Sequence, residues 1–271
     1  MNKTVTIIFS RDRCLQLDLL LRSLFTCVDD FSVFDVKIIY KSSNTRFENA
    51  YFTLASEWPG VEFIKETSFK DNLINAIDDY EYIMFLVDDT IICNHFNVNE
   101  ITTILNKNSG ILGFSLRIGK NTNYCFSCNN WQTVPEMHSI TNDISKFMWM
   151  FAQYDFFYVL EVSSSIFRSK DILSIIVDKE FNNPNQLEDK LFFNLGKFVV
   201  LKPRMACYNQ SVAFANPLNI VQTSNLSNRR GTDDKYSPEK LLELYEKGVR
   251  IRSDQFYGLI TNAAHQLVEL F

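Results

Sequence analysis

Four short apolar runs, separated by segments with helical periodicity, fill the first ninety residues and restrict the possible folds more than any other feature. The runs are TVTIIF (Thr4–Phe9), VKIIY (Val36–Tyr40), VEFI (Val61–Ile64) and YIMFLV (Tyr82–Val87). Such runs are typical of strands that are buried on both faces of a parallel sheet. Their alternation with helices predicts an α/β fold, with a Rossmann-like, mostly parallel sheet, right-handed crossovers and flanking helices.

The segments between these runs carry helical signals. Leucines recur through Cys14–Phe25, and Phe47, Tyr51 and Leu54 follow the i, i+4, i+7 spacing of one helix face. A further short helix is predicted at Phe69–Ile77. The order from the N-terminus is therefore strand, helix, strand, helix, strand, helix, strand.

The rest of the chain is less regular. Strands are predicted at Ile111–Leu116, Val159–Val162 and Phe198–Leu201, and helices at Asp171–Val177, Asn185–Leu195 and from Ser237-Pro238 to Gly248. Residues 119–148 and 207–235 are polar and predict irregular structure. Without a repeat or a low-complexity linker, the simplest organisation is a single domain over residues 1–271 with an elaborated C-terminal half.

Composition excludes several classes of protein. A net charge of −5 without a dense basic run argues against nucleic-acid binding. No G-x-G-x-x-G follows the first run, which disfavours a dinucleotide dehydrogenase. Neither a signal peptide nor a transmembrane segment is expected. The six cysteines favour a reducing cytoplasm, and the single pair Cys125/Cys128 lacks the second pair that a structural zinc usually needs.

Asp88 and Asp89 come directly after the most apolar run. Ligands bind beyond the carboxyl ends of strands in open α/β sheets, and two carboxylates there are costly unless something positive meets them. A divalent metal bound to a diphosphate would supply that charge. The alternative is an ordinary turn at the end of a strand, where Asp is common.

The segment YIMFLVDDTII resembles the metal-binding segment of GT-A fold glycosyltransferases, in which a strand delivers a DxD-type motif, although Thr90 is not acidic. The resemblance implies that Asp89 binds Mn²⁺ or Mg²⁺ and that Asp88 holds the ribose or a metal-bound water. TVTIIFSRDRCLQLDLLLRSL is similar to the first strand, loop and helix of the same fold. The resemblance implies contacts with the nucleotide from Phe9, Ser10 and Arg11.

The second run, VKIIYKSSN, resembles the strand whose end reaches the base or ribose in these enzymes. Ser42, Ser43 and Asn44 stand where the family usually has an acidic residue. The resemblance therefore implies nucleotide-sugar contacts from Ser42 and Asn44, and it leaves the nucleotide unidentified.

A second acidic pair lies in NQLEDKLFFNLG, at the start of a predicted helix. Acidic residues there can simply favour the helix dipole. The functional alternative is a general base that deprotonates an acceptor hydroxyl. Leu187-Glu188-Asp189 resembles the xED motif of inverting GT-A enzymes, which implies that Asp189 is the base and that Glu188 orients the acceptor.

Two later motifs complete the candidate site. His265 in NAAHQLVEL is either a packed or solvated side chain or, as the resemblance implies, a metal ligand brought over the diphosphate by the C-terminal segment. Arg229 and Arg230 in NRRGTDDKY could clamp a diphosphate, because Arg binds phosphate through a fork of donors. Their alternative is an exposed loop.

The expected protein is an inverting, metal-dependent glycosyltransferase of the hexosyl- or deoxyhexosyl-transferase class, acting in polysaccharide or glycan synthesis. Residues 1–118 would bind a nucleoside-diphosphate sugar, with a UDP-sugar favoured, and residues 119–271 would bind a glycan or small hydroxyl acceptor. One alternative is a sugar nucleotidyltransferase, although FSRDRC lacks the glycines usual there. Another is a non-catalytic module that binds a nucleotide or sugar.

Overall fold

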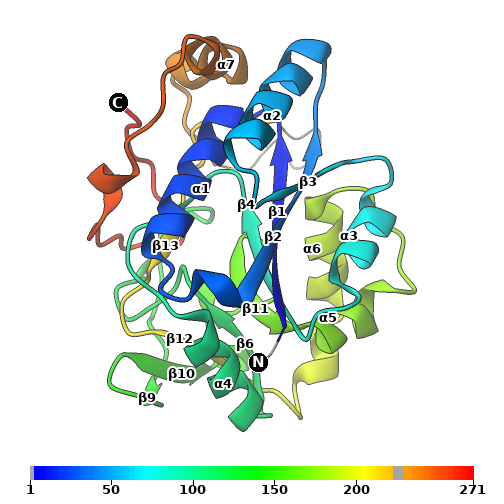
Figure 1. Ribbon diagram of the computed structural model, residues 1–271. Coiled ribbons are helices and arrows are strands. Elements are labelled where there is room, and N and C mark those ends of the chain that lie inside the picture. Colours follow the sequence, from blue (N-terminus) through cyan, green and yellow to red (C-terminus); the bar gives the residue numbers. More distant parts are fainter. Residues whose placement is uncertain (1–2, 222–228) are drawn as a thin grey trace.

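A nine-stranded sheet in the order β3-β2-β1-β4-β11-β6-β12-β10-β9 forms the centre of the computed structural model, which describes residues 3–221 and 229–271 (Figure 1). Its strands are β1 (Thr4–Arg11), β2 (Phe34–Lys41), β3 (Glu62–Lys65), β4 (Tyr82–Val87), β6 (Ile111–Ser115), β9 (His138–Ser139), β10 (Ile144–Met148), β11 (Ser164–Arg168) and β12 (Arg204–Tyr208). The four runs of the N-terminal segment supply β1 to β4, as predicted.

The sheet is mostly parallel. Strands β3, β2, β1 and β4 run in one direction, and β6 and β12 follow it, whereas β11 and β10 run opposite to their neighbours. The order 3-2-1-4 changes direction at β1, because β2 and β3 extend to one side of it and β4 lies on the other. That switch point is where α/β sheets open a crevice for ligands.

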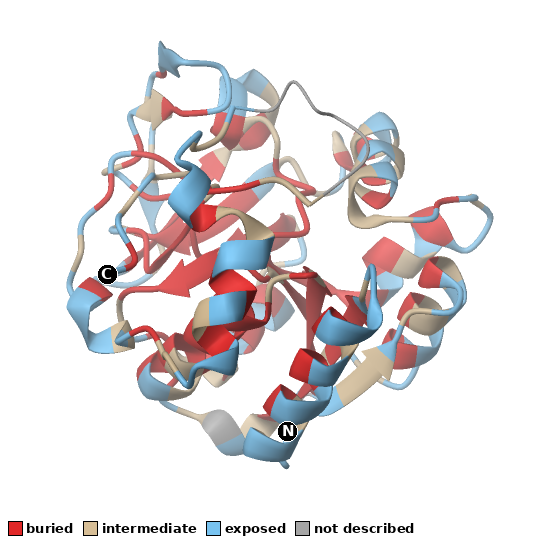
Figure 2. Cartoon of the chain, turned by 90° about the horizontal axis from the view of Figure 1, so that it is seen from above, coloured by how far each residue is buried: buried red, intermediate tan, exposed pale blue. Residues whose placement is uncertain are grey.

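Helices cover both faces of the sheet and bury two apolar layers. Helices α1 (Cys14–Cys27), α2 (Thr45–Glu57), α4 (Val98–Lys107) and α7 (Pro238–Glu246) pack on one face. Helices α3 (Phe69–Ile77), α5 (Ser169–Ile176) and α6 (Pro184–Phe193) pack on the other. Figure 2 shows the strands buried between these layers while the outer helix faces stay exposed. This is the α/β fold that the alternating pattern predicts.

Two small sheets complete the structure. Strands β5 (Thr90–Ile92) and β13 (Ala213–Ala215) pair with each other, and β7 (Tyr124–Cys125) pairs with β8 (Asn130–Trp131). Thr90 of β5 pairs with Ala215, which also forms a bridge to His265. The C-terminal segment is thereby held next to Asp89. Within the described ranges, no helix has the length and apolarity that crossing a membrane requires.

The predicted strand at Val159–Val162 is wrong. The strand in this region is β11, and residues 159–162 form a buried irregular segment ahead of it. The reason lies in two carboxylates that take the backbone N–H groups a strand would use. Glu188 accepts from the N–H of Val162 at 2.9 Å, and Glu161 accepts from the N–H of Ser163 at 2.5 Å.

The predicted strand at Phe198–Leu201 is also wrong. A 3-10 helix at Leu195–Phe198 continues into turns, and the N–H of Lys202 donates to the carbonyl of Phe198 at 2.7 Å. Val200 and Leu201 are 84% and 73% exposed, so this apolar stretch has no sheet to cover it. The strand forms instead at Arg204–Tyr208, and β10 lies in a region predicted to be irregular.

Candidate active site

A cavity of about 760 Å³ opens at the carboxyl edge of the sheet, beside the switch point. Phe9, Ser10 and Arg11 contribute from the end of β1, and Asp88 and Asp89 from the end of β4. Residues of the C-terminal half complete the lining, among them Tyr154, Phe157, Tyr158, Glu188 and Phe192. Its volume lies within the range of sites that hold a cofactor or a drug-sized ligand.

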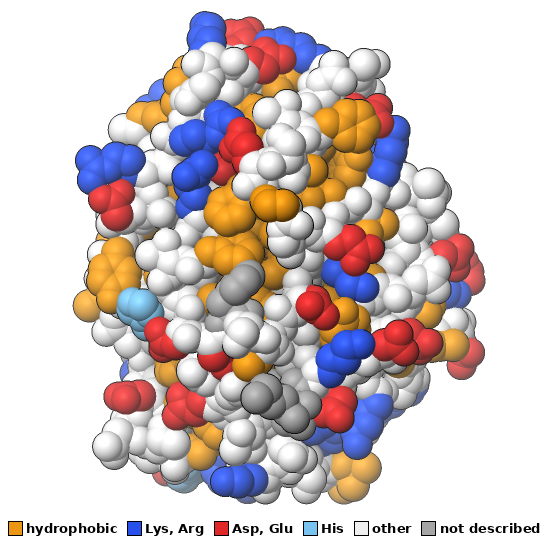
Figure 3. Space-filling model, in the orientation of Figure 1, with side chains coloured by type: hydrophobic (Ala, Val, Ile, Leu, Met, Phe, Trp, Pro, Cys, Tyr) orange, Lys and Arg blue, Asp and Glu red, His pale blue; other side chains and the backbone are white. Residues whose placement is uncertain are grey.

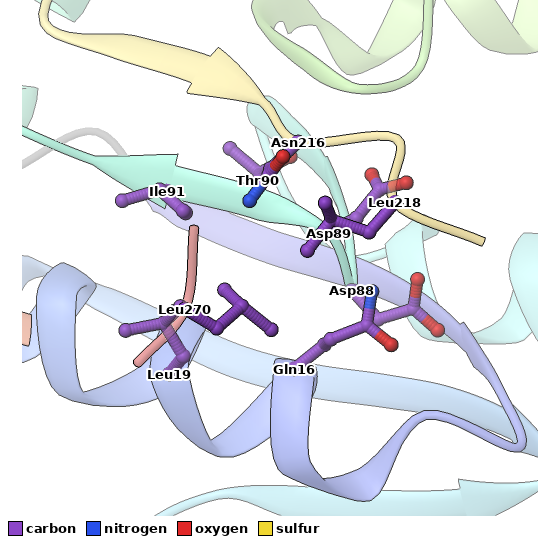
Figure 4. Close-up of a pocket in the computed structure, with 9 residues that line it drawn as sticks. All are labelled: Gln16, Leu19, Asp88, Asp89, Thr90, Ile91, Asn216, Leu218 and Leu270. Carbon is purple, nitrogen blue, oxygen red and sulfur yellow. The ribbon is translucent and has the colours of Figure 1, made fainter. Parts of the chain in front are cut away.

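Asp88 and Asp89 are already paired with a cation of the chain itself. Nη1 of Arg13 lies 2.9 Å from Oδ1 of Asp88 and 3.1 Å from Oδ2 of Asp89. The other oxygen of Asp88 accepts from the backbone N–H of Arg11 at 3.0 Å. Figure 4 shows the two aspartates where β4 ends, near Gln16 of α1 and Leu218 of the loop after β13.

Arg13 also ties this aspartate pair to the C-terminal half. Its Nε donates to Oδ1 of Asn219 at 2.7 Å, and its Nη2 donates to the carbonyl of Asn219 at 2.7 Å. Asn219 in turn donates to the carbonyl of Tyr236 at 2.7 Å. The guanidinium therefore connects the end of β4 to the loop that closes one side of the cavity.

The charge balance at Asp89 is incomplete. Burial raises the pKa of the Asp89 carboxyl to about 6, although Arg13 acts in the opposite direction. Burial lowers the pKa of Arg13, but Asp88 and Asp89 outweigh it, so this pKa is raised overall. One cation thus serves two carboxylates, and a ligand that brought further positive charge would stabilise the ionised form of Asp89.

The expected nucleotide contacts divide into two groups. Phe9, Ser10, Arg11 and Asp88 line the cavity. Ser42 and Asn44 are not among the described residues that line it. The side-chain oxygen of Asn44 instead caps α2, accepting from the N–H of Arg46 at 2.9 Å and of Phe47 at 3.2 Å. Near the ends of β2 and β3, the cavity is lined instead by Ile39, Lys41 and Glu66.

Of the acidic pair on α6, only one residue lines the cavity. Glu188 lines the cavity, accepts from the N–H of Val162 at 2.9 Å, and contacts the hydroxyl of Tyr158 at 3.4 Å. Asp189 is exposed and is not among the described lining residues. Burial raises the pKa of Glu188 to about 7, against the effect of the Val162 N–H. The carboxyl that lines the cavity is therefore that of Glu188, which the motif implies only orients the acceptor, and not that of Asp189, which the motif implies is the base.

His265 lines the same cavity, close to Arg117. Its Nε2 lies 3.5 Å from Nη1 of Arg117, and its Nδ1 is buried with no hydrogen-bond partner among the described residues. Burial, and then the charge of Arg117, lower the pKa of His265 to about 3, so the ring is neutral.

The residues around Asp89 fit a divalent cation only in one manner. Within residues 3–221 and 229–271 no three His, Cys, Asp or Glu side chains gather into a metal-binding cluster. Asp89 nevertheless has a second oxygen, Oδ1, that bonds to no other described residue. Mg²⁺ is commonly held by one or two carboxylates together with substrate phosphates and waters. The site therefore fits a cation that arrives with a diphosphate, not one held by the chain alone.

Arg229 and Arg230 both line the cavity. Nη1 of Arg229 donates to the hydroxyl of Tyr124 at 2.8 Å, and its guanidinium lies 4.3 Å from the ring centre of Phe126. Cys125 and Cys128 lie at the same wall, and all six cysteines of the chain are free thiols. Arg229 thus fastens the β7–β8 hairpin to the rim of the cavity.

Several charged residues were not identified from the sequence: Arg13, Lys41, Glu66, Arg117 and Asp155 line the cavity, and Glu161 is the counter-charge of Arg117. Arg13 and Arg117 each follow the end of a strand by two residues, and this spacing is the local signal that could have placed them at the carboxyl edge of the sheet. Glu161 is buried and accepts hydrogen bonds from Ser163, Ser164 and Ser165. Its position in a predicted strand concealed this role.

A mostly parallel sheet with flanking helices is the fold that the resemblance to GT-A glycosyltransferases implies. Staphylococcus aureus TarS has a similar fold, with a TM-score of 0.51 at 15% identity over 79% of this chain and 36% of that one. TarS 1–349 in complex with UDP gives a TM-score of 0.51 at 14% identity, over 80% of this chain and 61% of that one. At these identities the likeness concerns the fold.

Sequence comparison points to the same class. The chain is 33% identical over 297 aligned residues to the bifunctional glycosyltransferase pgtA of Dictyostelium discoideum, and the match covers 90% of this chain. The chain spans 38% of the length of that relative. No protein-family model matches this chain. Fold and sequence likeness together confirm the resemblance to GT-A glycosyltransferases that the motifs indicated.

Proposed function

We propose that this chain transfers a sugar from a nucleoside-diphosphate sugar, with a UDP-sugar favoured, to a hydroxyl of a glycan or small acceptor. The observation that carries the proposal is one cavity that is lined both by the strand-end pair Asp88 and Asp89 and by Glu188 of α6. The fold and the curated relative support the same class.

The donor is assigned to the side of the cavity formed by β1 and β4. Phe9, Ser10 and Arg11 lie at the switch point, where the nucleotide would contact the ends of the strands. The solved complex of TarS with UDP supports a uridine nucleotide. We assign the acceptor to the part of the cavity that Tyr154, Tyr158 and Glu188 line, within residues 119–271.

Mn²⁺ or Mg²⁺ is assigned to the free oxygen of Asp89. When bound, such an ion supplies positive charge that stabilises the departing nucleoside diphosphate. Arg13 keeps Asp88 and Asp89 in place and partly neutralised while the site is without ligand. The side chain of Asp88, fixed by the Arg11 N–H, is positioned to receive a ribose hydroxyl.

Glu188, not Asp189, is the residue we propose as general base. A base must reach the acceptor hydroxyl whose proton it takes, and Glu188 faces the cavity whereas Asp189 faces solvent. A base on the acceptor side favours attack opposite the leaving group and hence inversion of the anomeric centre. NMR of the product, which distinguishes α from β linkages, checks the stereochemistry.

Two alternative functions would not need all of these residues. A sugar nucleotidyltransferase joins a sugar phosphate, whose attacking oxygen is already ionised, to a nucleotide, so it would need no general base such as Glu188. A non-catalytic module would have no use for a carboxyl whose pKa is raised to about 7. We also propose a reducing, cytoplasmic location, and the six free thiols support it.

The test measures nucleoside diphosphate released from a panel of nucleotide sugars, with and without Mn²⁺ and with a panel of acceptors. We expect release from at least one donor, and we expect Asp89→Asn to lower turnover about 100-fold or more, because leaving-group stabilisation amounts to several kcal/mol. Asp254→Asn, which removes an exposed partner of Arg252, is the matched control. Nucleotide binding without release from any donor would support the non-catalytic module instead.

A further inference from the structure

Arg117 occupies a position that the proposed reaction does not yet use. It follows the end of β6 by two residues, and β6 is parallel to β4, so Arg117 lies at the same edge of the sheet as Asp88 and Asp89. It is 4% exposed and lines the cavity. A buried guanidinium normally has its donors satisfied by carboxylates or carbonyl groups.

Arg117 has a counter-charge but few hydrogen bonds. Its Nη2 lies 3.7 Å from Oε2 of Glu161, which is beyond hydrogen-bond distance. The oxygens of Glu161 are already used by Ser163, Ser164 and Ser165. Among the described residues, the one hydrogen bond of the Arg117 guanidinium is the contact of 3.5 Å with Nε2 of His265. Most of its five N–H donors thus have no acceptor among the described residues.

This contact determines where His265 carries its proton. A guanidinium can only donate, so the Nε2 that faces it must accept. A neutral imidazole has one N–H, which then belongs to Nδ1. Nδ1 is the buried atom without a partner among the described residues. A metal ligand at Nδ1 would place the proton on Nε2, directly against the donors of Arg117.

We propose that Arg117 and His265 form an anion subsite that binds phosphate oxygens of the donor's diphosphate, with His265 as a hydrogen-bond donor and not as a metal ligand. The proposal rests on the proposed function. The diphosphate is favoured over an anionic group of the acceptor because His265 forms a bridge to Ala215, and Ala215 pairs with Thr90 beside Asp89. The subsite and the aspartate pair therefore adjoin one another.

Calorimetric titration with inorganic pyrophosphate and with UDP, both in EDTA, tests the subsite without metal and without turnover. Arg117→Gln should weaken both ligands about 10- to 100-fold, the usual loss for a hydrogen bond to a charged group. His265→Phe should weaken both, while His265→Asn, whose amide offers a donor near the Nδ1 position, should stay close to wild type. Arg252→Gln, exposed and away from the cavity, is the control.

Wild-type affinity for both ligands in Arg117→Gln would overturn the proposal. A loss for pyrophosphate alone, with UDP unchanged, would overturn the assignment to the donor. If the wild-type chain binds neither ligand in EDTA yet turns over a nucleotide sugar with Mn²⁺, the subsite is wrong and the proposed function stands. If no nucleotide sugar is turned over but Arg117→Gln still loses pyrophosphate, the proposed function fails and the anion subsite stands.

Nitrogen-15 NMR of the imidazole rings gives a second readout that does not depend on the Arg117 variants. The chain has 3 histidines, so the His265→Asn spectrum assigns the signal of His265. We expect a protonated Nδ1 and an unprotonated Nε2, and the same pattern after Mg²⁺ is added. The opposite tautomer, or an exchange of tautomers on adding Mg²⁺, would contradict the proposal.

Discussion

Two adjacent carboxylates on α6 show how far a single position along a helix changes the chemistry available to a side chain. Glu188 and Asp189 are one residue apart, so a helix turns them about 100° away from each other. Glu188 is directed into the cavity, while Asp189 is exposed. The motif identifies the pair, but which member faces the acceptor depends on how the helix is rotated about its own axis.

The pH dependence of the reaction follows from Glu188. A general base acts when deprotonated, and burial raises its pKa to about 7. We therefore expect kcat/KM to rise with pH and to reach half of its maximum near pH 7. Glu188→Gln should lower turnover about 10²- to 10⁴-fold, whereas Asp189→Asn should keep the profile. The reverse pattern would make Asp189 the base, as the motif implies.

Stability provides the control for that variant. The folded state retains a proton on Glu188 between the ordinary pKa of 4.5 and about 7, where the unfolded chain has lost it. Stability should therefore fall as pH rises through this window. Glu188→Gln removes that loss, so its Tm should exceed the wild-type Tm above pH 7 and approach it near pH 4. A lowered Tm at every pH would indicate a structural defect instead.

At the scale of elements, the start of α2 decides between two roles for Asn44. The motif implies a nucleotide contact, but the structure uses the side-chain oxygen as a helix cap. Asn44→Ala should cost about 1 kcal/mol of stability, because two backbone N–H groups lose their acceptor, while UDP affinity stays unchanged. Asn44→Asp, which keeps a capping oxygen, should recover most of that stability. Loss of UDP binding in both variants would restore the predicted contact.

The elements that the sequence predicts well are those with one dominant signal. β1 and β4 are continuous apolar runs, and they form where predicted. Around β11 the signal fails, because the stretch before it is held by its own Glu161 and by Glu188, which comes 26 residues after Val162 in the chain. Val200 and Leu201 have strand propensity but no neighbouring strand to pair with. Tertiary partners of this kind are not visible in local sequence patterns.

The residues of the candidate site also differ in how much local signal the sequence carries for them. Asp88, Asp89 and Glu188 are found from motifs, because acidic residues at strand ends and helix starts have a local signature. Arg13 and Arg117 have a weaker local signature, two residues after the end of a strand, and their significance comes from the groups that they contact. His265 shows both cases. Its presence in the site is predicted, but the tautomer that decides its role depends on Arg117.

At the scale of the whole molecule, the two halves of the chain share one sheet and cannot be separated at residue 118. β6 lies between β11 and β12, so a strand from the first half is enclosed by two from the second. β11 in turn separates β6 from β4. We therefore expect the donor and acceptor sides of the cavity to unfold together.

Gly113 on β6 tests this cooperativity. A Cβ at this position would lie 2.4 Å from Cδ1 of Phe167 and 2.9 Å from the carbonyl oxygen of Ile166 on β11. Gly113→Ala should cost about 1–3 kcal/mol through overpacking, and should lower Tm by roughly 3–10 °C. Gly60→Ala, which meets nothing within 4 Å, is the matched control. Circular dichroism and tryptophan fluorescence should show a single shared transition, and two separate transitions would contradict a single unit.

The lining of the cavity also bears on how fast a ligand is captured. The described lining residues include Arg11, Arg13, Lys41, Arg117, Arg229 and Arg230, against the carboxylates Glu66, Asp88, Asp89, Asp155 and Glu188. The molecule as a whole carries a net charge of −5, and Figure 3 shows both signs of charge interspersed on one face. The net charge is largely screened beyond about one Debye length, roughly 8 Å at physiological salt, so a dianionic ligand responds mainly to the charges at the mouth of the cavity. Encounter is governed by the mouth of the cavity, not by the long-range field of the protein.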